Sequence, residues 1–379
     1  MEEVSMKALV VGGSGASGPL IVRGLIDRDY EVTVLGRGVH PPAVPDSVAQ
    51  IKADPFEAES LAAALESQSY DLVIAMYGVL RHVAAACVGL TPRFISVGGL
   101  APIYKGWGEM TSINPWETTS STPLFLEEAH VLAREEGIDR FAGAVRRAES
   151  FVMRLHADGD FNATHFRYPL VYGPGNICPA EWGLIRRARE GRRPLILPGG
   201  GLTLVARGFS ENMAHAILLA VDQPEASAGQ IYNICDARSQ YNAEWVQAVS
   251  KSSGHEFETV PIPFDLLPPG FRATPPQLLY RNHWVPSIQK VKDQLGYRDL
   301  VDFEQAIERT VRWYHDHPLG AGAEEERNLG DPFDYAYEDA VISAYHRLAV
   351  DFAENISVVP HVEVQWRHPY QKPQDHSED

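Results

Sequence analysis

The stretch Met6-Lys7-Ala8-Leu9-Val10-Val11-Gly12-Gly13-Ser14-Gly15-Ala16-Ser17-Gly18-Pro19-Leu20-Ile21-Val22 lies near the start of the chain and decides its fold. Ala8 to Val11 is a short apolar run, which is typical of a buried strand in a parallel sheet. Glycines follow, and an apolar helical pattern then opens with Pro19 in its first turn. This order predicts a turn that holds a dinucleotide pyrophosphate at a helix N-terminus. The turn residues expected to bind it are Gly12, Ser14, Gly15, Ala16, Ser17 and Gly18.

Strand and helix patterns alternate further along the chain. We expect strands at 30–35, 51–55, 71–75, 93–97 and 163–170, and helices at 60–65, up to about residue 89, at 124–136 and at 140–156. This alternation predicts an α/β fold of the Rossmann type, with a doubly wound parallel sheet and a ligand crevice at the carboxyl ends of its strands. The residues at those ends that we expect to bind the cofactor are Asp54, Pro55, Tyr77, Gly78, Gly98, Tyr168 and Pro169.

The end of the second predicted strand bears on the choice of cofactor. Sites for NAD usually carry an acidic residue there to hold the ribose hydroxyls, but this strand runs into Gly36-Arg37-Gly38. An arginine can accept a 2′-phosphate, so Arg37 predicts NADP(H) in preference to NAD(H). The alternative is that Arg37 is a solvated turn residue.

Composition limits the kinds of partner. The 379 residues carry a net charge of −17, which argues against nucleic acid or an anionic membrane surface as partners. The three cysteines, Cys87, Cys178 and Cys235, are far apart and fit neither a disulfide framework nor a zinc site. No signal peptide pattern and no apolar run of membrane-spanning length is visible, so we expect a cytoplasmic protein. His315-Asp316-His317 has metal-binding residue types, but a solvated helix end explains it better, and we expect no metal.

Taken together, these motifs resemble the extended short-chain dehydrogenase/reductase superfamily, and within it the NAD-dependent epimerase/dehydratase family. The landmarks occur in the family's order: the Gly12/Gly15/Gly18 loop, Asp54, Arg167-Tyr168-Pro169 with Tyr172-Gly173-Pro174-Gly175, the segment 207–216, and Gly229 to Ile234. The resemblance covers about residues 6–316. It implies a dinucleotide-binding domain at 1–173, to which 207–237 returns, and a substrate lobe at 174–206 and 238–320. Residues 321–379 form an extension without a counterpart, and relatives commonly form homodimers.

The family's usual catalytic set is a tyrosine, a lysine one helical turn later and a serine or threonine near the fifth strand, and this chain departs from it. With Glu149 in its family position, the lysine position holds Val145 and the tyrosine position holds Phe141. Gly98-Gly99-Leu100 occupies the region of the orienting serine. Phenylalanine and valine cannot move a proton, so the resemblance implies a cofactor site without the usual chemistry beside it.

Other polar residues are candidates for the missing roles. Tyr104 and Lys105, in the long loop after the fifth strand, could together act as an acid or a proton relay; the alternative is a packed tyrosine and a solvated lysine. Arg207 is the candidate for an anionic group of the substrate, with a structural salt bridge as the alternative. Tyr172 and Arg146 complete the expected substrate site.

A cofactor site without the family's usual catalytic set is compatible with two functions. The first is an atypical NAD(P)-dependent epimerase, dehydratase or reductase that acts on a small organic substrate. The alternative is a sensor or scaffold that binds NADP(H) without turning it over, because fold alone does not establish function.

Overall fold

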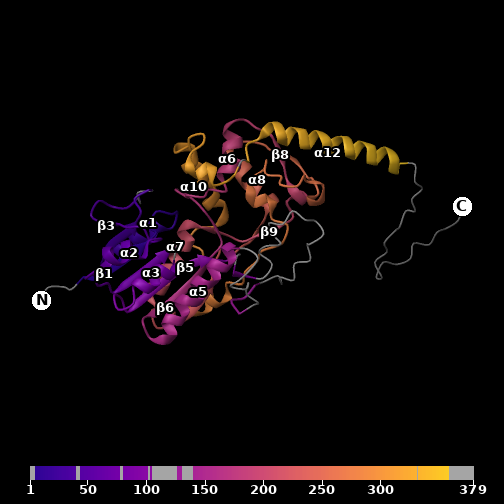
Figure 1. The fold of residues 1–379 in the computed structure, drawn as a ribbon. Coiled ribbons are helices and arrows are strands. Elements are labelled where there is room, and N and C mark those ends of the chain that lie inside the picture. Colours follow the sequence, from indigo (N-terminus) through magenta and orange to yellow (C-terminus); the bar gives the residue numbers. More distant parts are fainter. Residues whose placement is uncertain are drawn as a thin grey trace, which may run out of the picture.

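The computed structural model of the chain describes residues 5–39, 43–76, 80–100, 103–104, 126–129, 140–330 and 332–357. Its centre is a seven-stranded parallel sheet in the order β11-β6-β5-β4-β1-β2-β3 (Figure 1). This order is that of a Rossmann-type doubly wound sheet, so the predicted fold class is confirmed. The strands are β1 (Met6–Val11), β2 (Tyr30–Gly36), β3 (Ala49–Lys52), β4 (Leu72–Met76), β5 (Arg93–Gly99), β6 (Asn162–Tyr168) and β11 (Gln230–Asn233).

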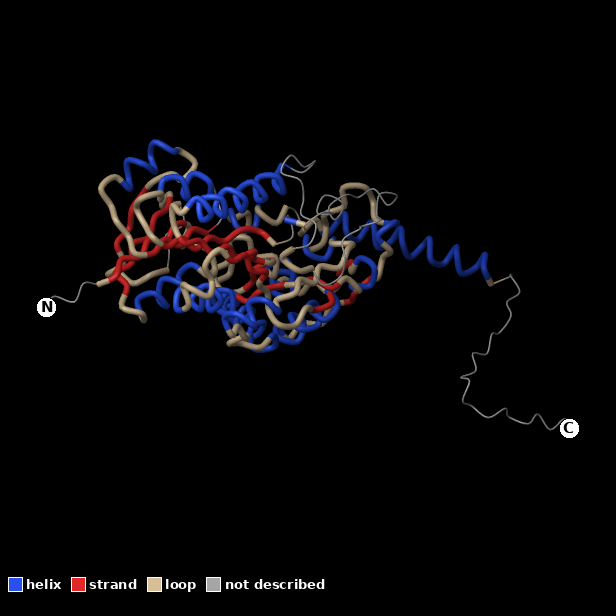
Figure 2. The backbone as a smooth tube through the Cα atoms, turned by 90° about the horizontal axis from the view of Figure 1, so that it is seen from below, coloured by secondary structure: helices blue, strands red, loops and turns tan. Residues whose placement is uncertain are grey.

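Helices cover both faces of this sheet (Figure 2). One face packs against α1 (Gly18–Ile26), α7 (Ser210–Asp222) and α9 (Gln289–Leu295), and the other against α2 (Ala58–Leu65), α3 (Leu80–Ala86) and α5 (Arg140–Asp158). Successive side chains of a strand point to opposite faces, so Val10 of β1 packs on the face covered by α1, α7 and α9, and Leu9 on the face covered by α2, α3 and α5. Both faces are therefore buried, which explains the nearly continuous apolar runs of β1 and β4.

Two predicted element boundaries need correction. The third strand ends at Lys52, so Asp54 and Pro55 lie in the turn that follows. The helix predicted at 124–136 is wrong for residues 126–129, since Leu126 forms a parallel bridge to Pro286 and its amide donates to the Val285 carbonyl at 2.9 Å. The rest of that predicted helix lies outside the described residues.

A second hydrophobic core lies outside the sheet. Three helices build it: α6 (Trp182–Arg189), α8 (Asn242–Ser253) and α10 (Phe303–Asp316). Short strands frame it in pairs: β7 (Leu170–Tyr172) with β10 (Arg207–Phe209), β8 (Pro194–Ile196) with β13 (Glu258–Val260), and β9 (Leu204–Val205) with β12 (Gln240–Tyr241). The 3-10 helices are η3 (Pro198–Gly201), η4 (Phe264–Leu266) and η5 (Pro276–Leu279). The domain limits predicted from the sequence stay a prediction.

The C-terminal extension packs onto this second core before it leaves the body. It contains α11 (Glu324–Arg327) and α12 (Tyr335–Ile356). Leu329 and Phe333 join the second core, and Val341 packs with Phe271 in a neighbouring cluster. The far half of α12 projects away from the rest of the molecule (Figure 1). Among the described helices, none is both long and apolar enough to span a membrane.

Candidate functional site

The glycine loop between β1 and α1 has the geometry that its sequence predicts. Gly12 has φ +84°, and a Cβ there would lie 2.5 Å from the Met76 carbonyl oxygen. A Cβ on Gly18 would lie 2.2 Å from the Gly13 carbonyl oxygen, so this glycine lets the helix approach the turn. At Gly15 nothing lies within 4 Å of the Cβ position. Gly12 and Gly18 are thus required by the turn and its packing, and Gly15 leaves space for a ligand.

A cavity of about 450 Å³ opens over this loop. Its walls come from the glycine loop, the end of β2, the turn after β3, and the segment from Tyr168 to Cys178. Of the residues predicted to bind the cofactor, those on the wall are Gly12, Ser14, Gly15, Ala16, Ser17, Arg37, Pro55, Tyr168 and Pro169. Sequence reasoning missed Phe56, Asn176 and Cys178, which also line it. The cavity lies at the carboxyl ends of the strands, where open α/β sheets bind ligands.

The rim of the cavity beyond β2 pairs a cation with an exposed aromatic ring. The Arg37 guanidinium carbon lies 5.7 Å from the centroid of the Phe56 ring, and Phe56 is 59% exposed. Asp54 Oδ1 accepts a hydrogen bond from the Phe56 amide at 2.9 Å. The Asp54 carboxylate therefore shapes the turn that presents Phe56, instead of lining the cavity as predicted. The exposed ring and the guanidinium over it, which forms no ion pair among the described residues, offer a stacking surface and a phosphate ligand side by side.

Several other predicted site residues lie elsewhere. Gly98 packs against His165, whose Nε2 would be 2.8 Å from a Cβ at this position, so the glycine makes room for a side chain and not for the cofactor. Tyr172 is buried and its hydroxyl donates to Asp236 Oδ2 at 3.0 Å. Tyr77, Gly78 and Lys105 lie outside the described residues.

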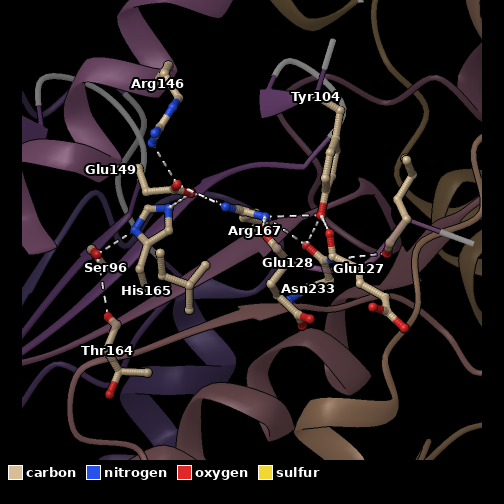
Figure 3. Close-up of polar contacts among 12 residues, drawn as sticks. Ser96, Tyr104, Glu127, Glu128, Arg146, Glu149, Thr164, His165, Arg167 and Asn233 are labelled. Carbon is tan, nitrogen blue, oxygen red and sulfur yellow. Dashed lines mark hydrogen bonds and ion pairs between the residues drawn. The ribbon is translucent and has the colours of Figure 1, made fainter. Parts of the chain in front are cut away.

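A buried polar network joins α5 to the sheet (Figure 3). Arg167 donates to both carboxylate oxygens of Glu149, from Nε at 2.7 Å and from Nη2 at 2.9 Å, and both side chains are 1% exposed. Arg146 also donates to Glu149, at 3.1 Å, from a position nearer the surface. Burial alone would raise the pKa of the Glu149 carboxyl, but its hydrogen bonds and the positive charge of Arg167 hold that pKa below its usual value.

Tyr104 belongs to the same network. Its hydroxyl lies 2.8 Å from Asn233 Oδ1 and 3.0 Å from the Glu127 carbonyl oxygen, and it accepts a hydrogen bond from Arg167 at 3.0 Å. The side chain is fully buried, and burial raises its pKa to about 12. This corrects the expectation of a proton relay at the site, because the hydroxyl is engaged inside the protein and is not on the cavity wall. Beside it, Val145 packs partly buried against the apolar cluster that contains Tyr104.

Ser96, His165 and Glu149 form a chain that superficially resembles the triad of a hydrolase (Figure 3). Ser96 Oγ lies 2.7 Å from His165 Nδ1, and His165 Nε2 lies 3.5 Å from Glu149 Oε2. All three residues are at most 1% exposed, and burial lowers the pKa of His165 to about 4. A nucleophile must reach its substrate, so this chain is a structural contact between β5, β6 and α5.

Arg207 is buried in the second core. Its guanidinium donates to Asn242 Oδ1 at 2.6 Å and lies over the Trp245 ring at 4.3 Å. Among the described residues no carboxylate comes within ion-pair distance of it, so the alternative of a structural salt bridge finds no partner there. Burial lowers the pKa of Arg207 to about 10, and the nearby Tyr172, Tyr280 and Glu181 oppose that change.

Glu181 is a buried carboxyl that sequence reasoning missed. Its Oε1 accepts a hydrogen bond from the Gly173 amide at 3.0 Å, whereas Oε2 has no partner among the described residues. Burial raises the pKa of Glu181 to about 7. The residue stands at the start of α6, three positions after Cys178, and no sequence pattern distinguishes it from a surface glutamate.

This pKa predicts that Glu181 makes the stability of the protein depend on pH. A folded-state pKa above the unfolded value stabilises the protein below about pH 4, and that contribution disappears as the pH rises through 7. Glu181→Gln removes the titration, so it should be nearly neutral at about pH 4 and more stable than the wild type by up to about 3 kcal/mol at about pH 8. Urea unfolding at both pH values measures this. Glu190→Gln, an exposed carboxyl at the other end of α6, is the control, and equal pH profiles for all three proteins would contradict the prediction.

Comparison with known proteins finds a matching family and similar folds. Residues 8–88 and 138–235 match the NAD dependent epimerase/dehydratase family. The UDP-glucose 4-epimerase of Thermotoga maritima, solved with UDP-glucose, superposes with a TM-score of 0.66 over 83% of this chain and 100% of that one, at 17% identity. At that identity the likeness shows the fold alone.

Curated relatives fall into more than one class. The 2′-dehydrokanamycin reductase of Streptomyces kanamyceticus is 29% identical over 181 residues, which are 46% of this chain and 45% of the reductase. A chloroplast stem-loop binding protein of 41 kDa from Arabidopsis thaliana is 23% identical over 79% of this chain and 77% of its own length.

The fold and the glycine-loop cavity together define a dinucleotide-binding protein of the extended short-chain dehydrogenase/reductase type. The chain belongs to the NAD-dependent epimerase/dehydratase family. Several of the similar proteins are named as epimerases, dehydratases, reductases or dehydrogenases, and four of the similar solved structures contain NAD. The resemblance stated from the sequence is thereby confirmed.

Proposed function

We propose that this protein is an NADP(H)-dependent reductase-type enzyme that acts on a small organic substrate, with a rearranged set of groups in place of the family's tyrosine, lysine and serine. The observation that carries the proposal is the pairing of Arg37 with the exposed ring of Phe56 at the rim of the glycine-loop cavity. NADP(H) differs from NAD(H) only in a 2′-phosphate, and this rim supplies a cation without a neighbouring carboxylate on β2.

The residues present fit the dinucleotide. The open Cβ position of Gly15 and the first amides of α1 suit a pyrophosphate, and Phe56 and Arg37 suit the adenosine end with its 2′-phosphate. Pro169 and the segment to Cys178 form the remaining wall. When bound, the nicotinamide would supply a hydride for reduction of the substrate.

The proton for such a reduction needs a source other than the missing tyrosine. In the segment from the end of β6 to Cys178, the wall residues with polar side-chain groups are Tyr168, Asn176 and Cys178. The Tyr168 hydroxyl donates to the Met213 carbonyl oxygen, which leaves the thiol as the group with a transferable proton. Desolvation on the cavity wall raises the pKa of the Cys178 thiol above its usual value and the nearby Glu181 adds to this effect, so the thiol keeps its proton at neutral pH.

Arg207 is 2% exposed and does not line the glycine-loop cavity, so its contact with an anionic group of the substrate stays a prediction. A guanidinium that is buried without a carboxylate partner gains stability from any anion that reaches it. Among the described residues, Glu181 is the carboxyl that acts on Arg207, and burial raises the pKa of Glu181 to about 7, so it is partly protonated at neutral pH.

Replacing Arg37 tests the cofactor preference. Arg37→Ala should weaken NADPH binding about 10- to 100-fold and leave NADH binding within about twofold, because one charge-assisted contact to phosphate contributes about 1.5–3 kcal/mol. Titration of the purified protein with each cofactor, followed by nucleotide fluorescence, gives both dissociation constants. Arg23→Ala, which removes a basic residue from the last turn of α1, is the matched control. Equal losses for NADPH and NADH would contradict the assignment.

The alternative function is a sensor or scaffold that holds NADP(H) without turning it over. The absence of the usual proton-transfer groups favours it, and the name of the stem-loop binding relative shows that one similar protein is described by what it binds. A net charge of −17 opposes nucleic acid as the partner of this chain. Loss of NADPH absorbance with any member of a ketone and aldehyde panel supports the enzyme. Tight NADPH binding with no turnover across the panel supports the sensor.

A further inference from the structure

The far half of α12 carries an apolar stripe that nothing in the described structure covers. Glu338, Val341 and Tyr345 lie on the face of α12 that contacts the body. The same helical face continues at Leu348, Phe352 and Ile356, which are 48%, 65% and 51% exposed. The spacing 341, 345, 348, 352 alternates steps of three and four residues, as in the seam of a coiled coil. Figures 1 and 2 show this half of the helix standing clear of the body.

The charges of this segment lie away from the stripe. At 100° per residue, Arg347 and Glu354 fall on the opposite face of the helix, and Asp351 lies to the side of the stripe, beyond Ala344. Ala344, Ala349, Ala353 and Asn355 flank the stripe, so its borders are small and uncharged. An amphipathic helix that binds an anionic membrane carries lysine and arginine on its polar face, and this one is mainly acidic, in a protein of net charge −17. A narrow apolar stripe with uncharged borders is suited to packing against another α-helix.

We propose that the stripe Tyr345, Leu348, Phe352 and Ile356, the α12 seam, is a homodimer interface that pairs antiparallel with the same segment of a second copy. The sequence is self-complementary in that direction. With a twofold axis near Val350, Leu348 faces Phe352 of the second copy, and Tyr345 faces Ile356. Each large side chain then meets an aliphatic one.

The position of the body selects the antiparallel orientation. The body packs around the N-terminal half of α12, where Tyr345 donates to the Pro261 carbonyl oxygen at 3.4 Å. Parallel helices would bring two bodies to the same end of the pair, whereas antiparallel helices hold them at opposite ends. The exposed segment 346–356 is about 16 Å long at 1.5 Å per residue. Two such segments bury less than the roughly 800 Å² per partner of a standard interface, so we expect a reversible dimer with a Kd on the order of micromolar.

Sedimentation velocity of the full chain across a range from about 1 to 100 μM tests the proposal. The wild type should shift with concentration from the 41.9 kDa monomer towards twice that mass. The double variant Leu348→Glu with Phe352→Glu should stay monomeric throughout. Val350→Glu is the matched control, because Val350 is 59% exposed on the same turn of helix but faces away from the seam, and it should dimerise like the wild type. All substituted side chains are exposed, so unchanged thermal unfolding is the expected check on folding.

A crosslink tests the orientation independently. In a Cys178→Ser background, whose remaining Cys87 and Cys235 are buried, a mixture of the single variants Leu348→Cys and Phe352→Cys should form a covalent heterodimer under mild oxidation. Parallel helices would instead crosslink each single variant with itself. Any of three results would overturn the proposal. They are a wild type that is monomeric at every concentration, a dimer that survives the two glutamates of the seam, and a Val350→Glu variant that is as monomeric as the double variant.

Discussion

Replacement of Glu149 by alanine is expected to lower the free energy of unfolding by about 3–5 kcal/mol. The carboxylate receives two hydrogen bonds from Arg167, and both side chains are 1% exposed. Removing it leaves the Arg167 guanidinium inside the protein, where its remaining partners among the described residues are the Tyr104 hydroxyl, the Asn233 amide oxygen and a main-chain carbonyl. An uncompensated buried charge is costly because nothing replaces the water that it lost.

Urea unfolding followed by tryptophan fluorescence measures the loss. Arg146→Ala removes another partner of the same carboxylate from a position that is 23% exposed, and should cost no more than about 1 kcal/mol. The double replacement Glu149→Leu with Arg167→Met should recover most of the stability, because it removes both charges together. A double variant as unstable as Glu149→Ala would contradict the role of the uncompensated charge. Tyr104→Phe should cost about 1 kcal/mol and leave turnover within a few-fold, as for a residue that holds Arg167.

This network also shows how far the sequence alone leads. The family resemblance, with Glu149 in its family position, implies that Val145 and Phe141 stand where the proton-transfer pair belongs, and this stays a prediction. The sequence could not predict that Glu149 would pair with Arg167, since that contact depends on the register of α5 against β6. Tyr104 illustrates the difference. A tyrosine in a long loop is compatible with an exposed acid or with a buried hydrogen bond, and only the packing of Asn233 and Arg167 around it decides between them.

The two walls of the cavity also differ in how far the sequence alone predicts them. The glycine loop is a local feature, so its glycines, the apolar strand before it and the helix start after it were enough to predict it. Arg37 and Pro55 were predicted in the same way, from their positions just after neighbouring strands. Asn176 and Cys178 reach the cavity from more than 150 residues further on, through a turn fixed by the hydrogen bond from the Cys178 amide to Asn176 Oδ1. No short-range pattern encodes that approach. Phe56 was within reach of sequence reasoning, because it directly follows the predicted Pro55.

The C-terminal extension was the least predictable part, because no family landmark covers it and its contacts are tertiary. Arg187 on α6 pairs with Glu338 on α12 at 2.7 Å, and neither side chain is exposed to solvent. Glu338 also accepts from Arg192 at 2.9 Å and from the Ile196 amide at 3.1 Å. One glutamate thus ties the extension to α6 and β8.

Glu338→Ala should therefore destabilise the protein by about 3–5 kcal/mol, comparable to Glu149→Ala, because Arg187 would stay buried without its charged partner. Urea unfolding again measures the change in the free energy of unfolding, with Asp339→Ala as the control. Asp339 is the next residue along α12 and pairs with Arg192, but its side chain is 56% exposed, so its removal should cost less than about 1 kcal/mol. Loss of this tie also frees α12 from the body, so Glu338→Ala should weaken dimerisation through the α12 seam, whereas Asp339→Ala should not. Equal stabilities for the two variants would show that the extension is held by its apolar contacts alone.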